Sequence, residues 1–325
     1  MPPALPCFAH LGQFRMKFFS AVAALLFSQG VTFSADPVLP QREQAERTRL
    51  PDLTRAETAT ERKPPTDIPA SATDDDAFGA QLILKERIRQ KYFQVFGEVG
   101  AFHTSNVALS RNDAHSDAFL NATAGLGWRR ALNDRLSLAI SGRYTLFRYS
   151  RFSVLDFQSA ETDVTLGIRL PKDWEFTIGY GFTRLNARTD STEFYHAHSL
   201  TAGFQRIFPL NDANALVVGL GPTWTWADPQ AAQRDKYAAY LGWRWRATER
   251  LSTMLLYRYG YYVYREGNTG RRDHNQTASL SVRYDATEWL SVTASGFGTW
   301  NRSNQSAFDY DAWNLGGSIG VNARF

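Results

Sequence analysis

Charged and amide side chains recur at every second position in several otherwise apolar stretches of this 325-residue chain. In a β-strand, residues two apart lie on the same face. This parity assigns one face to Glu98, Asn121, Arg129, Arg143, Glu161, Asp163, Arg169, Glu175, Tyr240, Arg244, Arg258, Asn275, Arg283 and Arg324. Because an arginine that faces lipid costs roughly 2–4 kcal/mol at the bilayer midplane, strands that cross a membrane must turn this face toward a lumen. Charged rings in a lumen tune ion selectivity.

Two interpretations of these charges remain open. The set holds seven arginines and four acids, so a water-filled lumen should draw anions, and Arg143 and Arg258 lie farther up the wall than the others. Alternatively, the arginines pair with acids such as Glu98, Glu161 and Asp163 and fill the interior of a narrow barrel. The first interpretation predicts passage of small polar or anionic solutes, and the second predicts a non-conducting barrel with a structural or export-associated role.

A hydrolytic site is a second alternative. His103 and Ser105 lie two apart on the outward face, and this spacing resembles the His-x-Ser arrangement of outer-membrane phospholipase A. Across the first hairpin, Asp117 is expected near His103, where it could orient the imidazole. Val107 stands where that family has a glycine. We therefore predict no enzyme, and we keep a lipid hydrolase as a minor alternative.

The histidines do not predict a metal centre. His196 and His198 share a strand face, but His103, His115 and His274 belong to other strands or loops. We expect these five side chains to be scattered near one end of the molecule, and we predict neither a metal nor a cofactor.

The elements that position these residues are strands. The final stretch, Trp313 to Phe325, alternates apolar with small or polar residues, and acidic turns recur at Asp134, Asp173, Asp212, Glu249 and Glu288 with spacings of 39, 39, 37 and 39 residues. One such period fits one hairpin of two strands that are long enough to cross a bilayer. Twelve strands are predicted near 92–104, 117–130, 136–148, 159–170, 174–184, 195–207, 215–226, 236–246, 251–262, 274–284, 290–300 and 312–325.

The connections alternate between tight turns and longer polar loops, which is typical of outer-membrane barrels. A β-propeller would divide each period into four short strands. Aromatic belts also favour the barrel. Trp128, Trp174, Trp243, Trp245 and Trp289 lie near the turn acids, whereas Trp224, Trp226, Trp300 and Trp313 lie at the opposite strand ends. Pro222 cannot donate a ladder hydrogen bond, so it predicts a bulge in the seventh strand.

The residues before the strands fall into three predicted segments. Residues 1–35 are typical of a signal peptide, with Met16 as the expected start and cleavage after Ser34. Residues 36–77 are rich in proline and charge, and they predict a disordered periplasmic tether. Residues 78–91 predict a short basic amphipathic segment before the barrel at 92–325. The only cysteine, Cys7, precedes the expected start, so no disulfide is expected.

Net charge gives no sign of nucleic-acid binding. Residues 92–325 hold 24 basic and 21 acidic side chains, a difference of only +3, although the pI is about 9.1. The positive charge is therefore not the clustered footprint that a polyanion needs.

The opening strand, FGEVGAFHTSNVALS, resembles the first strand of the outer-membrane β-barrel porin family, and RRDHNQTASLSVRYDATEWLSV and the terminal Phe325 are similar to the same group. The resemblance covers residues 78–325. It implies a bacterial outer-membrane location and a porin-like function. We thus predict an all-β, transmembrane, antiparallel up-and-down barrel of about 12 strands. Its expected partners are outer-membrane lipid, small solutes and the barrel assembly machinery, for which Phe325 would be the signal.

Overall fold

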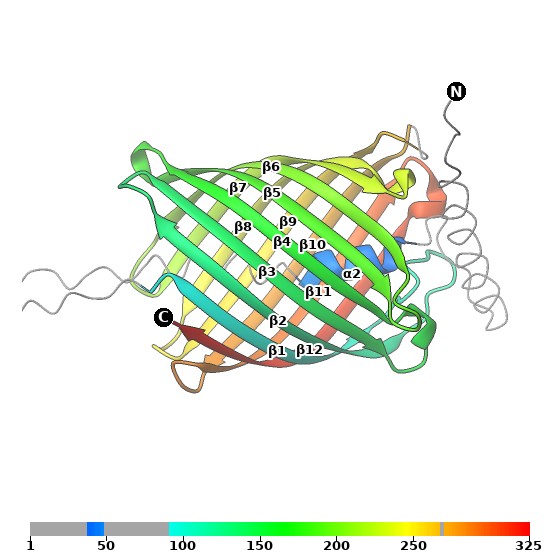
Figure 1. Cartoon of the computed structure of the whole chain (residues 1–325), viewed down its shortest axis with the longest axis horizontal. Coiled ribbons are helices and arrows are strands. Elements are labelled where there is room, and N and C mark those ends of the chain that lie inside the picture. The colour runs from blue at the N-terminus through cyan, green and yellow to red at the C-terminus, as the bar shows by residue number, and fades with distance from the viewer. Residues whose placement is uncertain (1–37, 49–90, 267–269) are drawn as a thin grey trace, which may run out of the picture.

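The computed structural model describes residues 38–48, 91–266 and 270–325. Twelve strands form one closed barrel in which each strand is antiparallel to its sequence neighbours and β1 also pairs with β12, as Figure 1 shows. The strands are β1 (Phe93–Thr104), β2 (Asp117–Ala131), β3 (Leu136–Tyr149), β4 (Phe157–Arg169), β5 (Trp174–Ala187), β6 (Glu193–Pro209), β7 (Asn214–Asp228), β8 (Arg234–Arg246), β9 (Leu251–Tyr264), β10 (Arg272–Asp285), β11 (Leu290–Ser303) and β12 (Tyr310–Arg324). The predicted fold class and strand number are confirmed.

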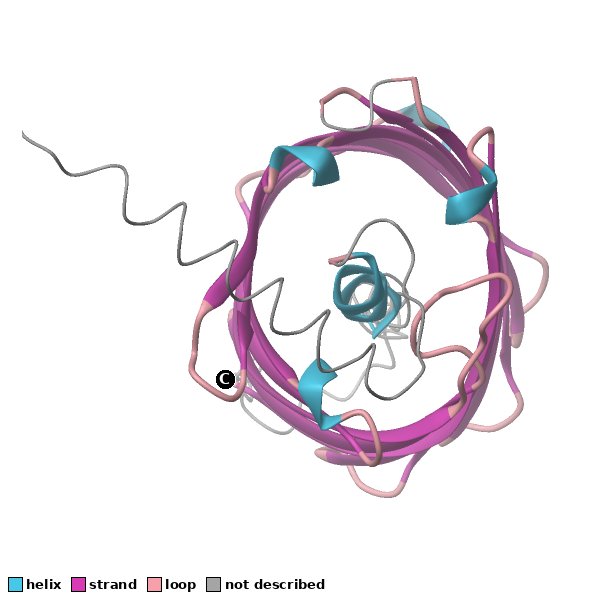
Figure 2. Ribbon diagram, turned by 90° about the vertical axis from the view of Figure 1, so that its right-hand side faces the viewer, coloured by secondary structure: helices cyan, strands magenta, loops and turns pink. Residues whose placement is uncertain are grey.

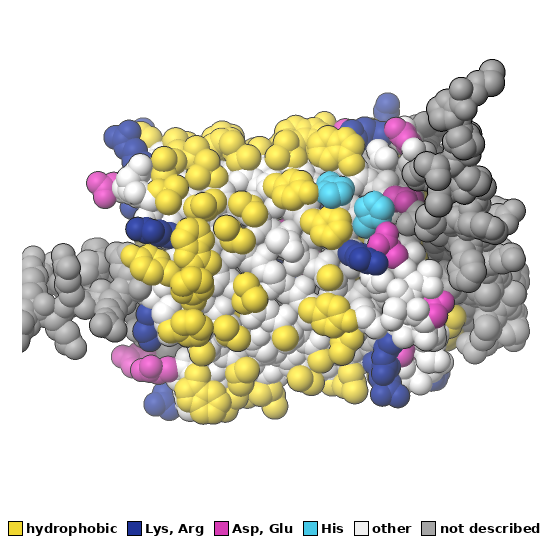
Figure 3. Space-filling model, in the orientation of Figure 1, with side chains coloured by type: hydrophobic (Ala, Val, Ile, Leu, Met, Phe, Trp, Pro, Cys, Tyr) yellow, Lys and Arg dark blue, Asp and Glu magenta, His cyan; other side chains and the backbone are white. Residues whose placement is uncertain are grey.

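Side chains alternate along every strand between an exposed outer face and a covered inner face. In β3, for example, Tyr144 and Leu146 are exposed, whereas Thr145 and Phe147 are buried. On the face that Figure 3 shows, apolar side chains are the commonest coloured group on the outside of the barrel, and lysines and arginines gather toward its two ends. A sheet whose outer face is apolar and whose edge strands pair with each other is suited to lipid, because its closed ladder supplies hydrogen-bond partners within the protein.

The first and last strands close the barrel. The amide of Phe93 donates to the carbonyl of Phe325 at 2.9 Å, and the amide of Phe325 donates back to the carbonyl of Phe93 at 3.0 Å. Their rings stack with centroids 6.2 Å apart. The aromatic terminal residue therefore completes the ladder at the point where the sheet meets itself.

Pro222 does not produce the predicted bulge. The register between β6 and β7 is the same on both sides of it, with Thr201 opposite Thr223 and Phe204 opposite Leu220, and only the pairing between these positions is interrupted. The neighbouring Gly221 explains how, because a Cβ there would lie 2.0 Å from the carbonyl oxygen of Ala202. The two strands approach closely at this glycine and tolerate the missing N–H without an inserted residue.

The two ends of the barrel differ. Four-residue turns join strands at one end, where β12 finishes, and longer loops join them at the other. Three of these loops carry single 3-10 turns, η1 (Ser153–Leu155), η3 (Gln230–Ala232) and η4 (Ser306–Phe308), and η2 (Pro171–Asp173) lies in a tight turn. Among the described residues, no helix is both long and apolar enough to cross a membrane.

An α-helix, α2 (Leu39–Thr48), lies inside the barrel, as the view along the axis shows (Figure 2). It occupies the half nearer the long loops (Figure 1). The structure therefore differs from the disordered periplasmic tether expected for residues 36–77, because residues 38–48 find packing and ionic partners on the barrel wall. The expected signal peptide, the rest of the tether and residues 78–90 lie outside the described residues.

Candidate functional site: the lumen around α2

Helix α2 has the sequence LPQREQAERT, in which glutamine, arginine, glutamate and alanine all have high helix propensity. Proline is tolerated in the first turn, where its missing N–H needs no partner. A ten-residue helix is marginal in water on its own. Contacts with the barrel must therefore supply the free energy that keeps α2 folded.

One side of α2 packs on an apolar region of the inner wall. Val38 and Ala45 belong to a buried cluster that includes Phe119, Phe147 and Phe157 from β2, β3 and β4. Phe147 and Phe157 stack with centroids 4.3 Å apart. This half of the interior is an aromatic core, which differs from the uniformly polar lumen that strand parity alone would suggest.

The loop between β1 and β2 completes the packing at the mouth. Val107 and Ala108 join the same buried cluster, and Leu109 packs with Leu39, Tyr310 and Ala312. The loop contains few charges on this side, so it covers the start of α2 with apolar surface. The β1–β2 loop therefore packs against the start of α2 at the long-loop end.

The opposite side of α2 is ionic. Arg234, at the start of β8, donates to Glu43 at 2.9 Å and to Glu46 at 2.6 Å. Lys236, on the same inner face, donates to the second oxygen of Glu46 at 3.0 Å. The side chain of Arg234 is only 2% exposed, and its guanidinium lies 4.6 Å from the ring centroid of Tyr262. Two glutamates of α2 therefore neutralise two cations of one strand.

Burial alone would raise the pKa of Glu46, but Arg234, Lys236 and Arg42 together outweigh it and hold that pKa well below its usual range. Glu46 therefore remains a carboxylate at neutral pH. Its negative charge is what attaches α2 to β8.

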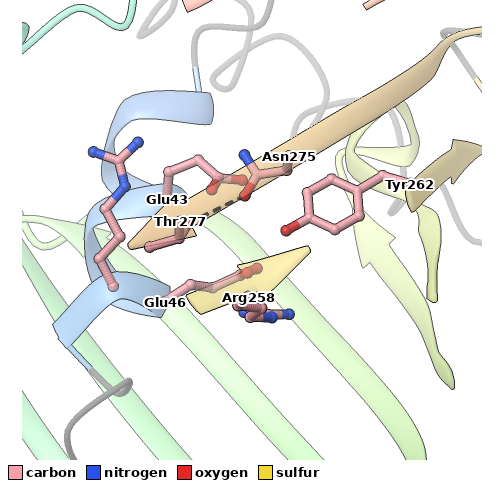
Figure 4. A pocket seen from close by; sticks show the side chains of 7 residues that line it. Glu43, Glu46, Arg258, Tyr262, Asn275 and Thr277 are labelled. Atoms are coloured by element: carbon pink, nitrogen blue, oxygen red, sulfur yellow. Dashed lines mark hydrogen bonds between the residues drawn. The ribbon is translucent and has the colours of Figure 1, made fainter. Parts of the chain in front are cut away.

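A small pocket lies between α2 and the wall. It is lined by Glu43, Glu46, Arg47, Arg258, Tyr262, Asn275 and Thr277, and Figure 4 shows Arg258 and Tyr262 on the wall facing the two glutamates. Within the described part of the chain, Arg258 forms no ion pair. It therefore adds a third positive charge beside Arg234 and Lys236.

The predicted lumen residues all lie at inward positions of their strands, but they do not share one environment. Arg143 and Glu161 form an ion pair of 3.2 Å at directly opposite positions of β3 and β4. Arg283 pairs with Asp285 at 2.8 Å, and Gln205 donates to Glu175 at 2.7 Å. Tyr240 donates to Gln205 at 2.8 Å. Some wall charges therefore pair with each other, whereas Arg258 forms no ion pair with another described residue.

The other predicted lumen residues differ in how far their side chains are buried. Asn121 and Asn275 are buried, and Glu98, Asp163, Arg129 and Arg244 are half-buried. Arg169 and Arg324 are exposed at the short-turn end, where their strands finish. Arg169 and Arg324 therefore lie at inward positions of their strands, but the barrel wall does not enclose their side chains.

Eight of the nine tryptophans lie at outward positions of their strands, and Trp289 lies in the turn before β11. Trp226, Trp243, Trp245, Trp289, Trp300 and Trp313 are exposed, and Trp128, Trp174 and Trp224 are half-buried. The rings of Trp243 and Trp245 stack with centroids 6.3 Å apart. Their distribution at the two strand ends is that of two aromatic belts.

The structure does not assemble the hydrolytic arrangement. Asp117 pairs in register with Thr104 and is 1% exposed on the inner face, whereas His103 is exposed on the outer face. The Ser105 hydroxyl oxygen accepts a hydrogen bond from the amide of Trp313 at 3.0 Å. The expectation that Asp117 orients His103 is wrong, because adjacent positions on paired strands alternate between faces.

The histidines have separate partners. His196 contacts Glu193 at 2.8 Å, His198 contacts the Tyr180 hydroxyl at 2.6 Å, and His274 contacts the Tyr259 hydroxyl at 2.6 Å. The described residues contain no group of three or more histidine, cysteine or acidic side chains that could hold a metal ion.

Sequence reasoning missed the four residues that matter most here: Glu43, Glu46, Arg234 and Lys236. Arg234 was expected in a loop, because the eighth strand begins two residues earlier than predicted. The run of helix-forming residues in α2 favours a helix. The high proline and charge content of the surrounding segment led instead to the prediction of disorder.

Comparisons with known proteins bear on the fold. No protein-family model matches the sequence, and no curated protein sequence matches it. Among solved structures, an outer-membrane channel from Pseudomonas putida F1 is 12% identical, covers 78% of this chain and 100% of its own, and has a TM-score of 0.53. The translocator domain of the autotransporter NalP from Neisseria meningitidis is 12% identical over 90% of this chain and 99% of its own, with a TM-score of 0.43.

The first likeness decides the fold. This chain shares the closed β-barrel fold of the Pseudomonas putida protein.

Proposed function

We propose that this chain is a porin-like barrel of a bacterial outer membrane, through which small polar or anionic solutes pass when α2 allows it. The observation that carries the proposal is the closed barrel whose outer face is apolar and whose inner face, on the side of β8 to β12, is lined by polar and charged groups. The tight turns would face the periplasm and the long loops the exterior. Phe325 would be the feature read by the barrel assembly machinery.

Helix α2 bears on how freely such a channel conducts. It lies within the barrel and is attached by buried ion pairs. This attachment also favours the second candidate, a barrel that does not conduct while α2 is in place.

Reconstitution into a planar bilayer tests the proposal. Discrete conductance steps, with a reversal potential in a KCl gradient that indicates anion preference, are the expected result. Replacing Arg258 by glutamate should shift that potential toward cations, because this side chain lines the lumen without an ionic partner among the described residues.

The matched control is Arg272→Glu, which changes the same charge at an exposed position near the rim. It should shift the reversal potential far less, because charges outside the lumen are screened within about 8–10 Å at physiological salt. A wild-type protein that gives no steps, together with an α2-deleted protein that also gives none, would overturn the proposal.

A further inference from the structure

The inner wall holds two kinds of cation. Arg143 pairs with Glu161 of the neighbouring strand, and Arg271 pairs with Asp273 of its own segment at 2.5 Å. Within the described part of the chain, by contrast, the only carboxylates that pair with Arg234 and Lys236 belong to α2. Acids of the wall therefore neutralise some of its cations, whereas acids of α2 neutralise the cluster of Arg234 and Lys236.

This cluster has a defined shape. Arg234 and Lys236 lie two apart on β8, and Arg258 lies on the adjacent strand β9, opposite Tyr240. The carboxylates that they face, Glu43 and Glu46, are separated by one helical turn, which places their Cβ atoms roughly 5–6 Å apart. Tyr264 adds a hydroxyl that accepts a hydrogen bond from Arg234 at 3.2 Å. The cluster thus presents several donors to two anionic groups held a short distance apart.

Several polar groups of the helix that covers the cluster are buried without a partner in the described part of the chain. Gln41 Oε1, Gln44 Nε2 and two guanidinium nitrogens of Arg47 are buried without a hydrogen-bond partner among the described residues. Because buried polar groups without partners destabilise a packed segment, they lower the free energy needed to displace α2.

We propose that Arg234, Lys236 and Arg258 form a binding site for solutes that carry two carboxylate or phosphate groups, and that Glu43 and Glu46 occupy this site as internal substitutes. A solute of this kind competes with the two glutamates and displaces α2 from β8. This inference rests on the proposed channel function for its biological meaning, but the binding itself requires no conduction.

Binding is measured by calorimetry on the full chain in detergent, with citrate and pyrophosphate as probes and acetate as the monovalent control. In the E43Q/E46Q variant, citrate or pyrophosphate should bind at least about tenfold more tightly than in wild type, because the internal competitor has lost its charge. The R234Q/K236Q variant should bind neither probe measurably. E193Q, which removes an acid on the outer face near the rim, should leave both affinities unchanged.

Equal affinity in wild type and E43Q/E46Q, binding that survives R234Q/K236Q, or acetate binding as tight as citrate binding would each overturn the proposal. Heat-dependent gel mobility shows whether each variant is a closed barrel. If citrate binds but no variant conducts, the site stands and the channel function fails.

A second measurement does not depend on changing the charges. Ala45 is buried against the wall, so an Ala45→Cys variant in a Cys7→Ser background should react slowly with a charged maleimide. Citrate should accelerate this reaction several-fold, and acetate at equal ionic strength should not. A cysteine at the exposed Ser153 serves as the reference, and equal effects of citrate at both positions would contradict displacement of α2.

Discussion

At the scale of single residues, the charges inside the barrel are distinguished by what balances them. The pair between Arg143 and Glu161 joins two strands, and the Glu161 side chain is 3% exposed. Glu161 also accepts a hydrogen bond from Ser159 at 2.7 Å. This pair belongs to the wall itself, so it should contribute to the stability of the barrel rather than to the attachment of α2.

Replacing Glu161 by glutamine should lower the free energy of unfolding by about 3–5 kcal/mol, because the Arg143 guanidinium would remain partly buried without its carboxylate. Urea unfolding in detergent, followed by tryptophan fluorescence, measures this change. Glu193→Gln removes a comparable pair with Arg184, whose side chain is 48% exposed, and should cost less than about 1 kcal/mol. Equal losses in the two variants would contradict the assignment of Glu161 to a structural pair.

At the scale of elements, α2 is attached to β8 by carboxylates, so its attachment depends on pH. The folded-state pKa of Glu46 lies below its usual value. A carboxylate with a depressed pKa stabilises the docked state fully above its unfolded pKa, about 4.3, and this stabilisation is lost as the pH falls through the lower folded pKa.

The conductance of the reconstituted protein should therefore be constant between pH 7 and pH 5 and should rise only as the pH falls below the ordinary glutamate pKa of about 4.3, because Glu46 then binds a proton more readily in the undocked state than in the docked state. Single-channel recording at a series of pH values tests this. E43Q/E46Q should lack this acid-induced rise. A rise in wild type already between pH 7 and pH 5 would show that groups other than Glu46 control the helix.

The elements differ in how well the sequence predicts them. Strand β1 was predicted to begin at Tyr92 and begins at Phe93, and β9 and β10 are similarly close to their predicted ranges, because a period of two with an apolar outer face is imposed by lipid along the whole strand. The face of each charged residue follows from the same period. The partner of each charge does not, because Arg234 finds its carboxylates about 190 residues away, and no local pattern records that contact.

The hydrolytic hypothesis shows the same limit at the scale of a hairpin. Spacing placed Asp117 opposite the strand that carries His103, but the register puts it opposite Thr104 and turns it inward. A shift of one residue reverses the face. Boundary errors of this size are therefore harmless for the fold and decisive for a site.

At the scale of the whole molecule, the closed hydrogen-bond ladder should make the barrel resistant to unfolding in detergent. The protein should migrate faster on a gel when it is unheated than after boiling, and circular dichroism should show mainly β-structure. Equal mobility before and after heating, or substantial helix, would contradict a closed barrel of twelve strands.

We propose that the lumen is a path for solutes and that α2 occupies this path. Single-channel conductance of the wild-type protein, compared with that of a chain that lacks residues 39–48, tests it most directly. We predict larger discrete steps with anion preference in the shortened chain, because Arg234, Lys236 and Arg258 would then face water. Equal conductance in the two proteins, or none in either, would contradict the claim.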